Sequence, residues 1–148
     1  MPRPEKKLKV LFLCMGNSCR SQMAEGWARA LKGDAIEPYS AGVAPGSLDA
    51  RAVAVMAEAG VDISGHRPKR VDEMKDVEFD CVVTVCDSAR EACPLFPGRT
   101  RTVHRSFEDP PALARNARTE EEALTHYRRV RDEIRAFVES LPEGLAAR

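Results

Sequence analysis

Short, continuous apolar runs alternate along the chain with segments in which apolar residues recur every three to four positions. Leu8 to Leu13 and Phe79 to Val85 are runs of the first kind, and their length and strand-forming residues are typical of buried strands. Ser21 to Leu31 and Asp49 to Ala59 are segments of the second kind, and a glycine follows closely after each of them. These spacings predict two amphipathic helices that stop near the glycines.

The remaining elements are less regular, except for the last one. Ile36 to Ser40 and Arg101 to Val103 predict two further short strands, whereas Cys86 to Cys93 is ambiguous between helix and loop. A long helix is predicted to begin after Thr119, which with Glu122 has the spacing of a capping box. The apolar stripe of this helix consists of Tyr127, Val130, Ile134, Phe137, Val138 and Leu141.

Strands that alternate with helices predict an α/β fold. We expect a single domain over residues 1–148, with a four-stranded parallel sheet and helices on both faces, because right-handed crossovers place helices there. Ligands of such sheets bind beyond the carboxyl ends of the strands. The segments that follow strands should therefore meet at one edge, and they are Cys14 to Ser21, Cys86 to Cys93 and His104 to Asp109.

The charge balance narrows the range of partners. The chain has 23 basic and 23 acidic side chains, so no overall field attracts it to nucleic acid or anionic lipid. No apolar run approaches the ~18 residues that span a bilayer, and no signal-peptide pattern follows the polar start of the chain. We therefore expect a cytoplasmic monomer that binds a small molecule, with no membrane or nucleic-acid partner.

The five cysteines of the chain indicate catalysis, metal binding or redox switching in a reducing compartment. Cys14 follows the first predicted strand, and a loop of this length can turn its backbone N–H groups inward as an anion-binding nest. Arg20 can bind two oxygens of a tetrahedral oxyanion, while the helix dipole favours the thiolate of Cys14, to which Ser21 can donate a hydrogen bond. The residues expected to bind the oxyanion are Met15, Gly16, Asn17, Ser18, Cys19 and Arg20.

Other roles for this loop are weaker. A structural loop is the default for an isolated Cys and Arg at this spacing, but the Gly, the Ser and the strand-to-helix setting favour the oxyanion site. A nucleotide-binding P-loop would end in Gly-Lys-Ser or Gly-Lys-Thr, which this loop lacks. A zinc site of Cys14 and Cys19 with Cys86 and Cys93 is disfavoured, because the second pair is spaced too widely. We expect no bound metal there.

The stretch from Cys14 to Trp27, CMGNSCRSQMAEGW, resembles the signature of the low-molecular-weight protein tyrosine phosphatase superfamily, and in detail that of its thioredoxin-coupled arsenate reductases. The resemblance covers most of the chain, and it implies a four-stranded parallel sheet with flanking helices. The further matching segments are Tyr39 to Gly42, Asp62 to Ser64, Val82 to Cys86, Cys93-Pro94, Phe107 to Pro110 and Arg129 to Ile134.

The resemblance implies a redox cycle that involves three of the cysteines. Cys14 forms an adduct with arsenate, and Cys86 attacks it, which releases arsenite and leaves a Cys14–Cys86 disulfide. Cys93 then attacks Cys86, and thioredoxin reduces the resulting Cys86–Cys93 disulfide. Phosphate and sulfate are expected to bind as analogues of arsenate, and thioredoxin is the electron donor, with no bound cofactor required.

The spacing of Cys86 and Cys93 imposes a mechanical requirement on this cycle. If the segment between them were one helix, their Cα atoms would lie about 10.5 Å apart. A disulfide tolerates at most about 7 Å. The segment is therefore predicted to unwind in part during turnover.

Asp109-Pro110 follows the fourth predicted strand and reads as an extended or turn dipeptide. Alone it would indicate a turn, but the resemblance makes Asp109 the candidate general acid for the leaving oxygen. Phosphatases of this superfamily typically place an aromatic residue after the Asp-Pro pair to pack on a tyrosine substrate. Pro111 and Ala112 stand there instead, which disfavours an aryl substrate.

Some members of the superfamily hold a potassium ion near the loop, through residues that match Asn17, Glu25 and Ser40 and a carboxylate that aligns with Lys69. Potassium is therefore doubtful here, since the Lys69 ammonium could replace the charge of the ion. A solvated surface lysine is the alternative. The basic cluster around Lys69, with Arg67 and Arg70, is more often a solvated face than an anion site.

Three functions remain open: a thioredoxin-coupled arsenate reductase with weak phosphatase activity, a phosphomonoester phosphatase, and a non-catalytic oxyanion-binding redox sensor. Cys86 and Cys93 favour the first. Cys19 is expected to support the loop or buffer it against oxidation, and Cys81 is expected in the core. The histidines show no ligand-like grouping, and surface or packing roles are predicted for them.

Overall fold

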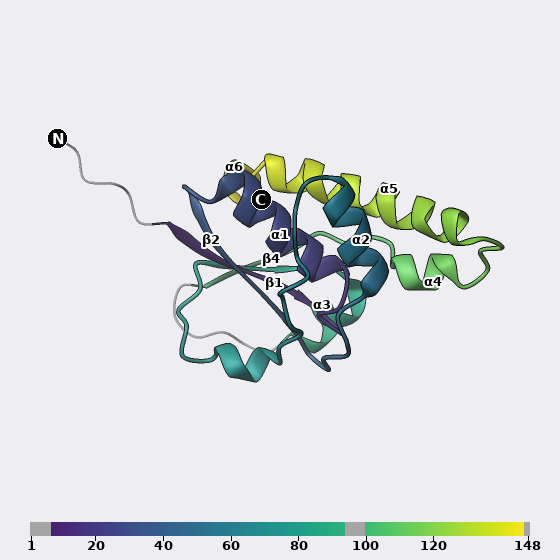
Figure 1. Cartoon of the computed structure of the whole chain (residues 1–148). Helices are drawn as coiled ribbons and strands as arrows, with labels where there is room; N and C mark the ends of the chain where they lie inside the picture. Colours follow the sequence, from purple (N-terminus) through teal and green to yellow (C-terminus); the bar gives the residue numbers. More distant parts are fainter. Residues whose placement is uncertain (1–6, 94–99, 147–148) are drawn as a thin grey trace.

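The computed structural model describes residues 7–93 and 100–146, which form one α/β domain around a four-stranded sheet (Figure 1). All strands are parallel, and their order across the sheet is β2-β1-β3-β4. The predicted fold class is confirmed. The strands are β1 (Leu8–Cys14), β2 (Ile36–Gly42), β3 (Cys81–Thr84) and β4 (Arg101–His104).

β1 occupies the centre of the sheet because it is apolar along most of its length. Val10 to Leu13 are fully buried, as expected for a parallel strand that is covered on both faces. β1 pairs with β2 along its whole length and with β3 over Val10 to Leu13. Its carboxyl end therefore lies between two neighbours, and Cys14 is opposite Gly42 of β2.

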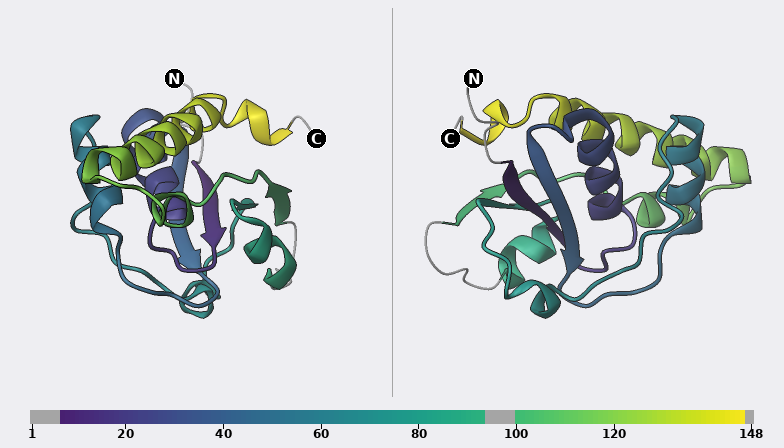
Figure 2. Two further views of the ribbon diagram at one scale, coloured as in Figure 1. Left: turned by 90° about the vertical axis from the view of Figure 1, so that its right-hand side faces the viewer. Right: turned by 60° about the vertical axis from the view of Figure 1, so that its left-hand side comes forward.

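Helices cover both faces of the sheet, as predicted. α1 (Arg20–Lys32) and α5 (Glu120–Glu139) pack together on one face, and α2 (Ala50–Glu58) packs against α5. Figure 2 shows α3 (Asp87–Ala92) on the opposite side, where a right-handed crossover from β3 to β4 places it. In the described ranges no helix is long and apolar enough to cross a membrane. The remaining short helices are η1 (Val71–Met74), α4 (Pro110–Ala114) and α6 (Glu143–Ala146).

Side-chain caps fix where two of the helices begin. The Asp49 carboxylate accepts the N–H of Arg51 at 2.9 Å and so caps α2. The Thr119 hydroxyl accepts the N–H of Glu122 at 3.0 Å at the start of α5. The Glu122 carboxylate, however, accepts the N–H of Arg118 rather than that of Thr119. The predicted capping box is therefore only half formed.

The region after β3 differs from the prediction in two ways. The strand predicted to reach Val85 ends at Thr84, although Val85 still donates a backbone hydrogen bond to Leu13 at 3.0 Å. The segment that was ambiguous between helix and loop forms α3, with Cys86 at its N-cap and Cys93 at its C-cap. Residues 94–99, which include the proline of the Cys-Pro pair, lie outside the described residues.

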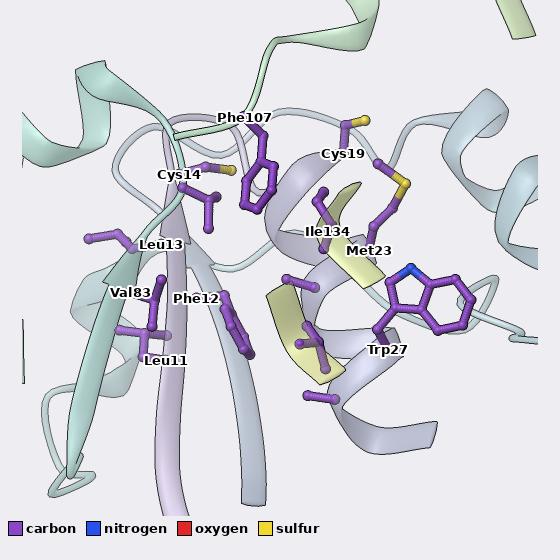
Figure 3. Packing of buried hydrophobic residues seen from close by; sticks show 14 of the residues in the cluster. Leu11, Phe12, Leu13, Cys14, Cys19, Met23, Trp27, Val83, Phe107 and Ile134 are labelled. Carbon is purple, nitrogen blue, oxygen red and sulfur yellow. The ribbon is translucent and has the colours of Figure 1, made fainter. Parts of the chain in front are cut away.

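The main core fills the space between the sheet and the layer of α1 and α5 (Figure 3). Cys81 is only 4% exposed within the core, as predicted, and burial raises the pKa of its thiol to about 11. The labelled core side chains of the sheet, α1 and α5 in Figure 3 include Leu11, Phe12, Val83, Met23, Trp27 and Ile134.

Candidate oxyanion site

Cys14 and Arg20 stand at the two ends of the loop that joins β1 to α1. Cys14 is the last residue of β1, Cys19 occupies the N-cap of α1, and Arg20 is the first residue of α1. Cys14 is nearly buried, with 3% of its surface exposed. The N-terminus of α1, which carries the positive end of the helix dipole, therefore adjoins the loop.

The backbone carbonyls of the loop are turned outward by the segment that follows β2. Four of the loop carbonyls accept an N–H from residues 43–49, whereas the Asn17 carbonyl accepts the Gln22 side-chain amide. In a planar trans peptide the C=O and the next N–H point in opposite directions. The following N–H groups of the loop are therefore directed inward, which is the arrangement of an anion-binding nest. The bonds are Val43 N to Cys14 O (3.1 Å), Ala44 N to Met15 O (2.8 Å), Gly46 N to Gly16 O (2.9 Å) and Asp49 N to Ser18 O (2.9 Å).

Asn17 fixes the conformation of the loop from inside. It is fully buried and has a positive φ of 49°, which asparagine tolerates better than most residues. Its side-chain oxygen accepts the backbone N–H of Lys69 at 2.8 Å and the Gln22 amide at 3.1 Å. Its backbone N–H lies 3.2 Å from the Cys14 sulfur. Asn17 thus ties the loop to the adjoining helix α1 and to the distant residue Lys69, and its N–H faces the Cys14 sulfur.

Ser21 is oriented to donate to the Cys14 sulfur. The Asn17 side-chain oxygen is already an acceptor for Lys69, so the Asn17 amide nitrogen is the atom that donates to the Ser21 hydroxyl oxygen, at 2.8 Å. The Ser21 hydroxyl proton is then free to point at the Cys14 sulfur, 2.9 Å away. The two side chains that the sequence predicts to interact are thus in contact, with the hydroxyl as the donor.

Gly42 lets β2 approach the loop closely. A Cβ atom at this position would lie 2.6 Å from the Met15 carbonyl oxygen and 3.0 Å from the Asn17 nitrogen. No side chain fits there without moving the backbone of the loop. The glycine that ends β2 is therefore a requirement of the site and not only of the turn.

Arg20 connects the loop with the segment after β4. One guanidinium nitrogen donates to the Phe107 carbonyl at 2.9 Å, and another lies 3.6 Å from the Asp109 carboxylate. The Asp109 side chain is 41% exposed, while that of Arg20 is 15% exposed. The carboxyl group is therefore accessible to a ligand, and the arginine is largely held in place.

A cleft of about 460 Å³ lies where the three post-strand segments meet. Arg20, Cys86 and Asp109 all line it, as predicted from the topology of the sheet. Its walls carry several carboxylates and hydroxyls, and the aromatic residue among them is buried in the core. The lining residues are Arg20, Cys86, Asp87, Ser88, Ser106, Phe107, Glu108 and Asp109.

Cys86 and Cys93 lie at opposite ends of α3. Cys86 is 4% exposed, and its sulfur accepts the N–H of Ala89 at 3.4 Å. Cys93 is partly exposed, and burial raises the pKa of its thiol. All five cysteines are reduced in this structure, and the two thiols of α3 are separated by its whole length.

Asn17, Glu25 and Ser40, which would match a potassium site, lie close to Lys69, and its ammonium group stands beside Glu25. The Lys69 nitrogen lies 4.0 Å from the Glu25 carboxylate and donates to the Arg67 carbonyl at 3.0 Å. The Ser40 hydroxyl donates to the same Glu25 oxygen at 2.5 Å. The Lys69 side chain is 17% exposed and is not a solvated surface group, and burial lowers its pKa. A cation bound by Glu25 would compete with this ammonium, so the cluster does not fit a resident potassium ion.

Cys19 sits within the loop but differs from Cys14 in its surroundings. It is 3% exposed, and burial together with the nearby Asp49 carboxylate raises the pKa of its thiol well above the ordinary value. Such a thiol is a poor nucleophile at neutral pH. This supports a packing role for Cys19 within the loop.

The family of the chain follows from its sequence as well as from this geometry. Residues 9–148 match the family described as low molecular weight phosphotyrosine protein phosphatase. The chain belongs to this family. Arg20, which follows the loop, and Asp109, which follows β4, line one cleft, and Cys14 lies at the end of β1 and is not among the lining residues.

Individual relatives within this phosphatase family are arsenate reductases. The arsenate reductase of Bacillus subtilis (strain 168) is 46% identical over 125 residues, which are 84% of this chain and 88% of that protein. The arsenate reductase of Halalkalibacterium halodurans is 42% identical over 137 residues, or 93% of this chain and 96% of that protein.

Solved structures in the same family include both activities. An arsenate reductase in the phosphate binding state has a TM-score of 0.70 and 30% identity, and the match covers 90% of this chain and 95% of that one. An arsenate reductase in the oxidized state has a TM-score of 0.69 and 29% identity, with 90% and 95% covered. A low molecular weight protein tyrosine phosphatase from T. tengcongensis has a TM-score of 0.70 and 29% identity, with 93% and 99% covered. The fold is thus shared by reductases and a phosphatase.

Two parts of the site are not predicted from the sequence. The segment 43–49 supplies the donors that turn the loop carbonyls outward, but it has no motif of its own. His104, which is predicted to have an ordinary role, bonds to both Thr84 and Asp87 beside the cleft. Its position at the carboxyl end of β4 is the one signal that could have pointed to it.

Proposed function

We propose that the protein reduces arsenate to arsenite, with Cys14 as the nucleophile and Cys86 and Cys93 as the source of two electrons. The observation that carries this proposal is the position of Cys86, which lines the same cleft as Arg20 and Asp109. Ester hydrolysis needs a nucleophile, an arginine and an acid, but it needs no second thiol at the cleft. The activity named for the two bacterial relatives supports the same assignment.

In the proposed first step the Cys14 thiolate attacks the arsenic atom of arsenate. The inward N–H groups of the loop and the Arg20 guanidinium bind the remaining oxygens and stabilise the charge that develops on them. Asp109 protonates the oxygen that leaves, so that water departs and a sulfur–arsenic bond forms. The Ser21 hydroxyl donates a hydrogen bond to the attacking Cys14 sulfur.

In the second step Cys86 attacks the Cys14 sulfur. A Cys14–Cys86 disulfide forms, and the electron pair of the sulfur–arsenic bond passes to arsenic, which leaves as arsenite. Cys93 then attacks the Cys86 sulfur and releases the Cys14 thiolate. The two electrons gained by arsenic are thus balanced by one disulfide between Cys86 and Cys93.

A dithiol protein of the thioredoxin type is the proposed reductant of that disulfide. Cys93 is partly exposed at the end of α3, where an external thiolate can reach the disulfide. Such a donor requires a reducing compartment, so we place the reaction in the cytoplasm. We also propose a monomeric enzyme, which size-exclusion chromatography tests directly.

Weak hydrolysis of phosphomonoesters is proposed as a side activity, because phosphate and arsenate share shape and charge. The phosphatase structure with the same fold supports this second activity. An aryl group finds no aromatic partner after the Asp-Pro pair, since Pro111 and Ala112 belong to α4. Aryl phosphates should therefore be poor substrates.

A coupled assay tests the assignment. NADPH consumption is measured with arsenate, thioredoxin and thioredoxin reductase, and hydrolysis of an aryl phosphate is measured in parallel. Cys86→Ser should abolish multiple-turnover arsenate reduction and leave the phosphate hydrolysis within about twofold, because hydrolysis needs no second thiol. Cys81→Ala is the matched control, since this cysteine is buried in the core away from the cleft. Equal loss of both activities in Cys86→Ser would reject its redox role.

A further inference from the structure

The imidazole of His104 bridges the sheet and the first residue of α3. Its Nδ1 lies 2.7 Å from the Thr84 hydroxyl, and its Nε2 lies 2.9 Å from the Asp87 carboxylate. Thr84 is fully buried and pairs with His104 in the register of β3 and β4. The Thr84 hydrogen bond therefore fixes the ring to the sheet, and the opposite ring nitrogen binds Asp87 of α3.

Both protonation states of the ring can keep this arrangement. The Asp87 carboxylate is an acceptor, so Nε2 must carry a hydrogen. In the neutral ring Nδ1 accepts the Thr84 hydroxyl proton, and in the charged ring Nδ1 donates to the same oxygen. The bridge therefore does not depend on a single charge state of His104.

The two residues that His104 binds, Thr84 and Asp87, lie on either side of Cys86 in the sequence. Thr84 precedes Cys86 by two residues, and Asp87 follows it directly, so one imidazole holds the chain on both sides of this thiol. The Cys86 sulfur accepts the N–H of Ala89 and thereby caps α3. Cys86 cannot keep this bond geometry when its sulfur moves to join another thiol.

α3 is too short to lose one turn and remain a helix. It has 6 residues, which is less than two turns, and the loss of one turn leaves too little for a cooperative helix. A Cys86–Cys93 disulfide requires the Cα atoms to approach within about 7 Å, whereas a helix holds them about 10.5 Å apart. Formation of that disulfide therefore opens the helix and moves Asp87, the residue that His104 holds.

We propose that His104 is a positioning residue for the cysteine relay, since its hydrogen bond to Asp87 latches α3 in the reduced protein and is released when the Cys86–Cys93 disulfide forms. This inference rests on the proposed function, because it assumes that disulfide. The latch stabilises only the reduced form. Its loss shifts the equilibrium toward the disulfide and makes the reduction potential of the Cys86–Cys93 pair more negative.

The test is a redox titration of the full chain in mixtures of reduced and oxidised glutathione, which cover the potentials of disulfides that thioredoxin reduces. In this exchange Cys86 and Cys93 lose two electrons and two protons to form their disulfide, and oxidised glutathione gains them and becomes two molecules of reduced glutathione. The fraction of Cys86–Cys93 disulfide is read by alkylation and mass spectrometry. The proteins compared are the unmodified chain, Asp87→Asn, His104→Phe, the double variant and Glu91→Gln.

His104→Phe should favour the disulfide by about fivefold, which is about 20 mV for a two-electron couple. Asp87→Asn should shift the potential in the same direction but by less, because the Asn side-chain oxygen can still accept from Nε2. The double variant should shift no further than His104→Phe alone, because that change already removes the whole interaction. Glu91→Gln, which removes an exposed carboxylate from the same helix, should leave the potential unchanged. Melting temperatures of the reduced proteins show whether His104→Phe still folds, and Asp87→Asn alters a side chain that is 77% exposed.

Unchanged potentials in Asp87→Asn and His104→Phe, or shifts that add in the double variant, would overturn the latch. If the unmodified chain forms no Cys86–Cys93 disulfide at any glutathione ratio, the proposed function fails together with the latch. A disulfide that forms normally, with potentials that the variants do not move, rejects the latch alone.

Discussion

Asn17 has no chemical step in the proposed reaction, yet its side chain and backbone are both used to build the site. It contacts the nucleophile, the serine that orients the nucleophile, and the backbone of Lys69. A buried polar network of this kind is stable only when every member has its partners. In the described part of the chain no buried side-chain nitrogen or oxygen lacks a hydrogen-bond partner. The loop is therefore organised before any ligand arrives, which lowers the cost of binding an oxyanion.

Lys69 leads to a prediction about potassium. Its ammonium lies beside the Glu25 carboxylate, so the unmodified protein should reduce arsenate equally well in potassium and in sodium buffers. Lys69→Asp removes that charge and adds a carboxylate, and arsenate reduction by this variant should depend on potassium. Arg67→Gln is the matched control, since the Arg67 side chain is exposed and pairs with Glu73 on the surface. Clear stimulation of the unmodified protein by potassium at neutral pH would show that the Lys69 ammonium does not take the place of a potassium ion.

Lys69 also predicts that the effect of potassium on the rate depends on pH. Burial lowers the pKa of Lys69, so as the pH rises its charge is lost earlier than that of an ordinary lysine. Stimulation of the unmodified enzyme by potassium should therefore increase as the pH rises. Rates measured in potassium and sodium buffers across the pH range check this, and a potassium effect that does not change with pH would count against it.

Among the elements, α3 differs from the others in how it is held. α1 and α5 pack against each other through a continuous apolar core, whereas α3 is short, and both Cys86 and the His104 bridge hold its N-terminal end. Helices with little packing of their own open at low cost. The element that carries the two relay cysteines is thus the one best suited to deform.

Amide hydrogen exchange provides the prediction for this element. Oxidation to the Cys86–Cys93 disulfide should raise the exchange rate of the backbone amides of α3, because the helix cannot span the disulfide geometry. The amides of β1 and α1 should exchange at unchanged rates, since no bond there has to break. Peptide-resolved exchange of the reduced and oxidised proteins measures both, and equal protection of α3 in the two forms would show that it does not open.

For the whole molecule, the parts that follow from the sequence are those encoded locally. Apolar runs and helical spacing predict the strands, the long helices and the all-parallel sheet, and the sheet then predicts that Arg20, Cys86 and Asp109 share one edge. The approach of Gly42 to the loop and the bridge through His104 join residues far apart in the chain. No periodicity or spacing specifies such contacts, because they depend on how the finished elements pack.

The most direct measurement is a single turnover with Cys93→Ser, in which the relay must stop at its first disulfide. The reduced variant is mixed with arsenate in the absence of thioredoxin, and the products are analysed by arsenic speciation and by mass spectrometry of the alkylated protein. The proposed chemistry predicts about one arsenite per chain together with a Cys14–Cys86 disulfide. Arsenate that remains unreduced, or arsenite formed while Cys86 stays a free thiol, would contradict it.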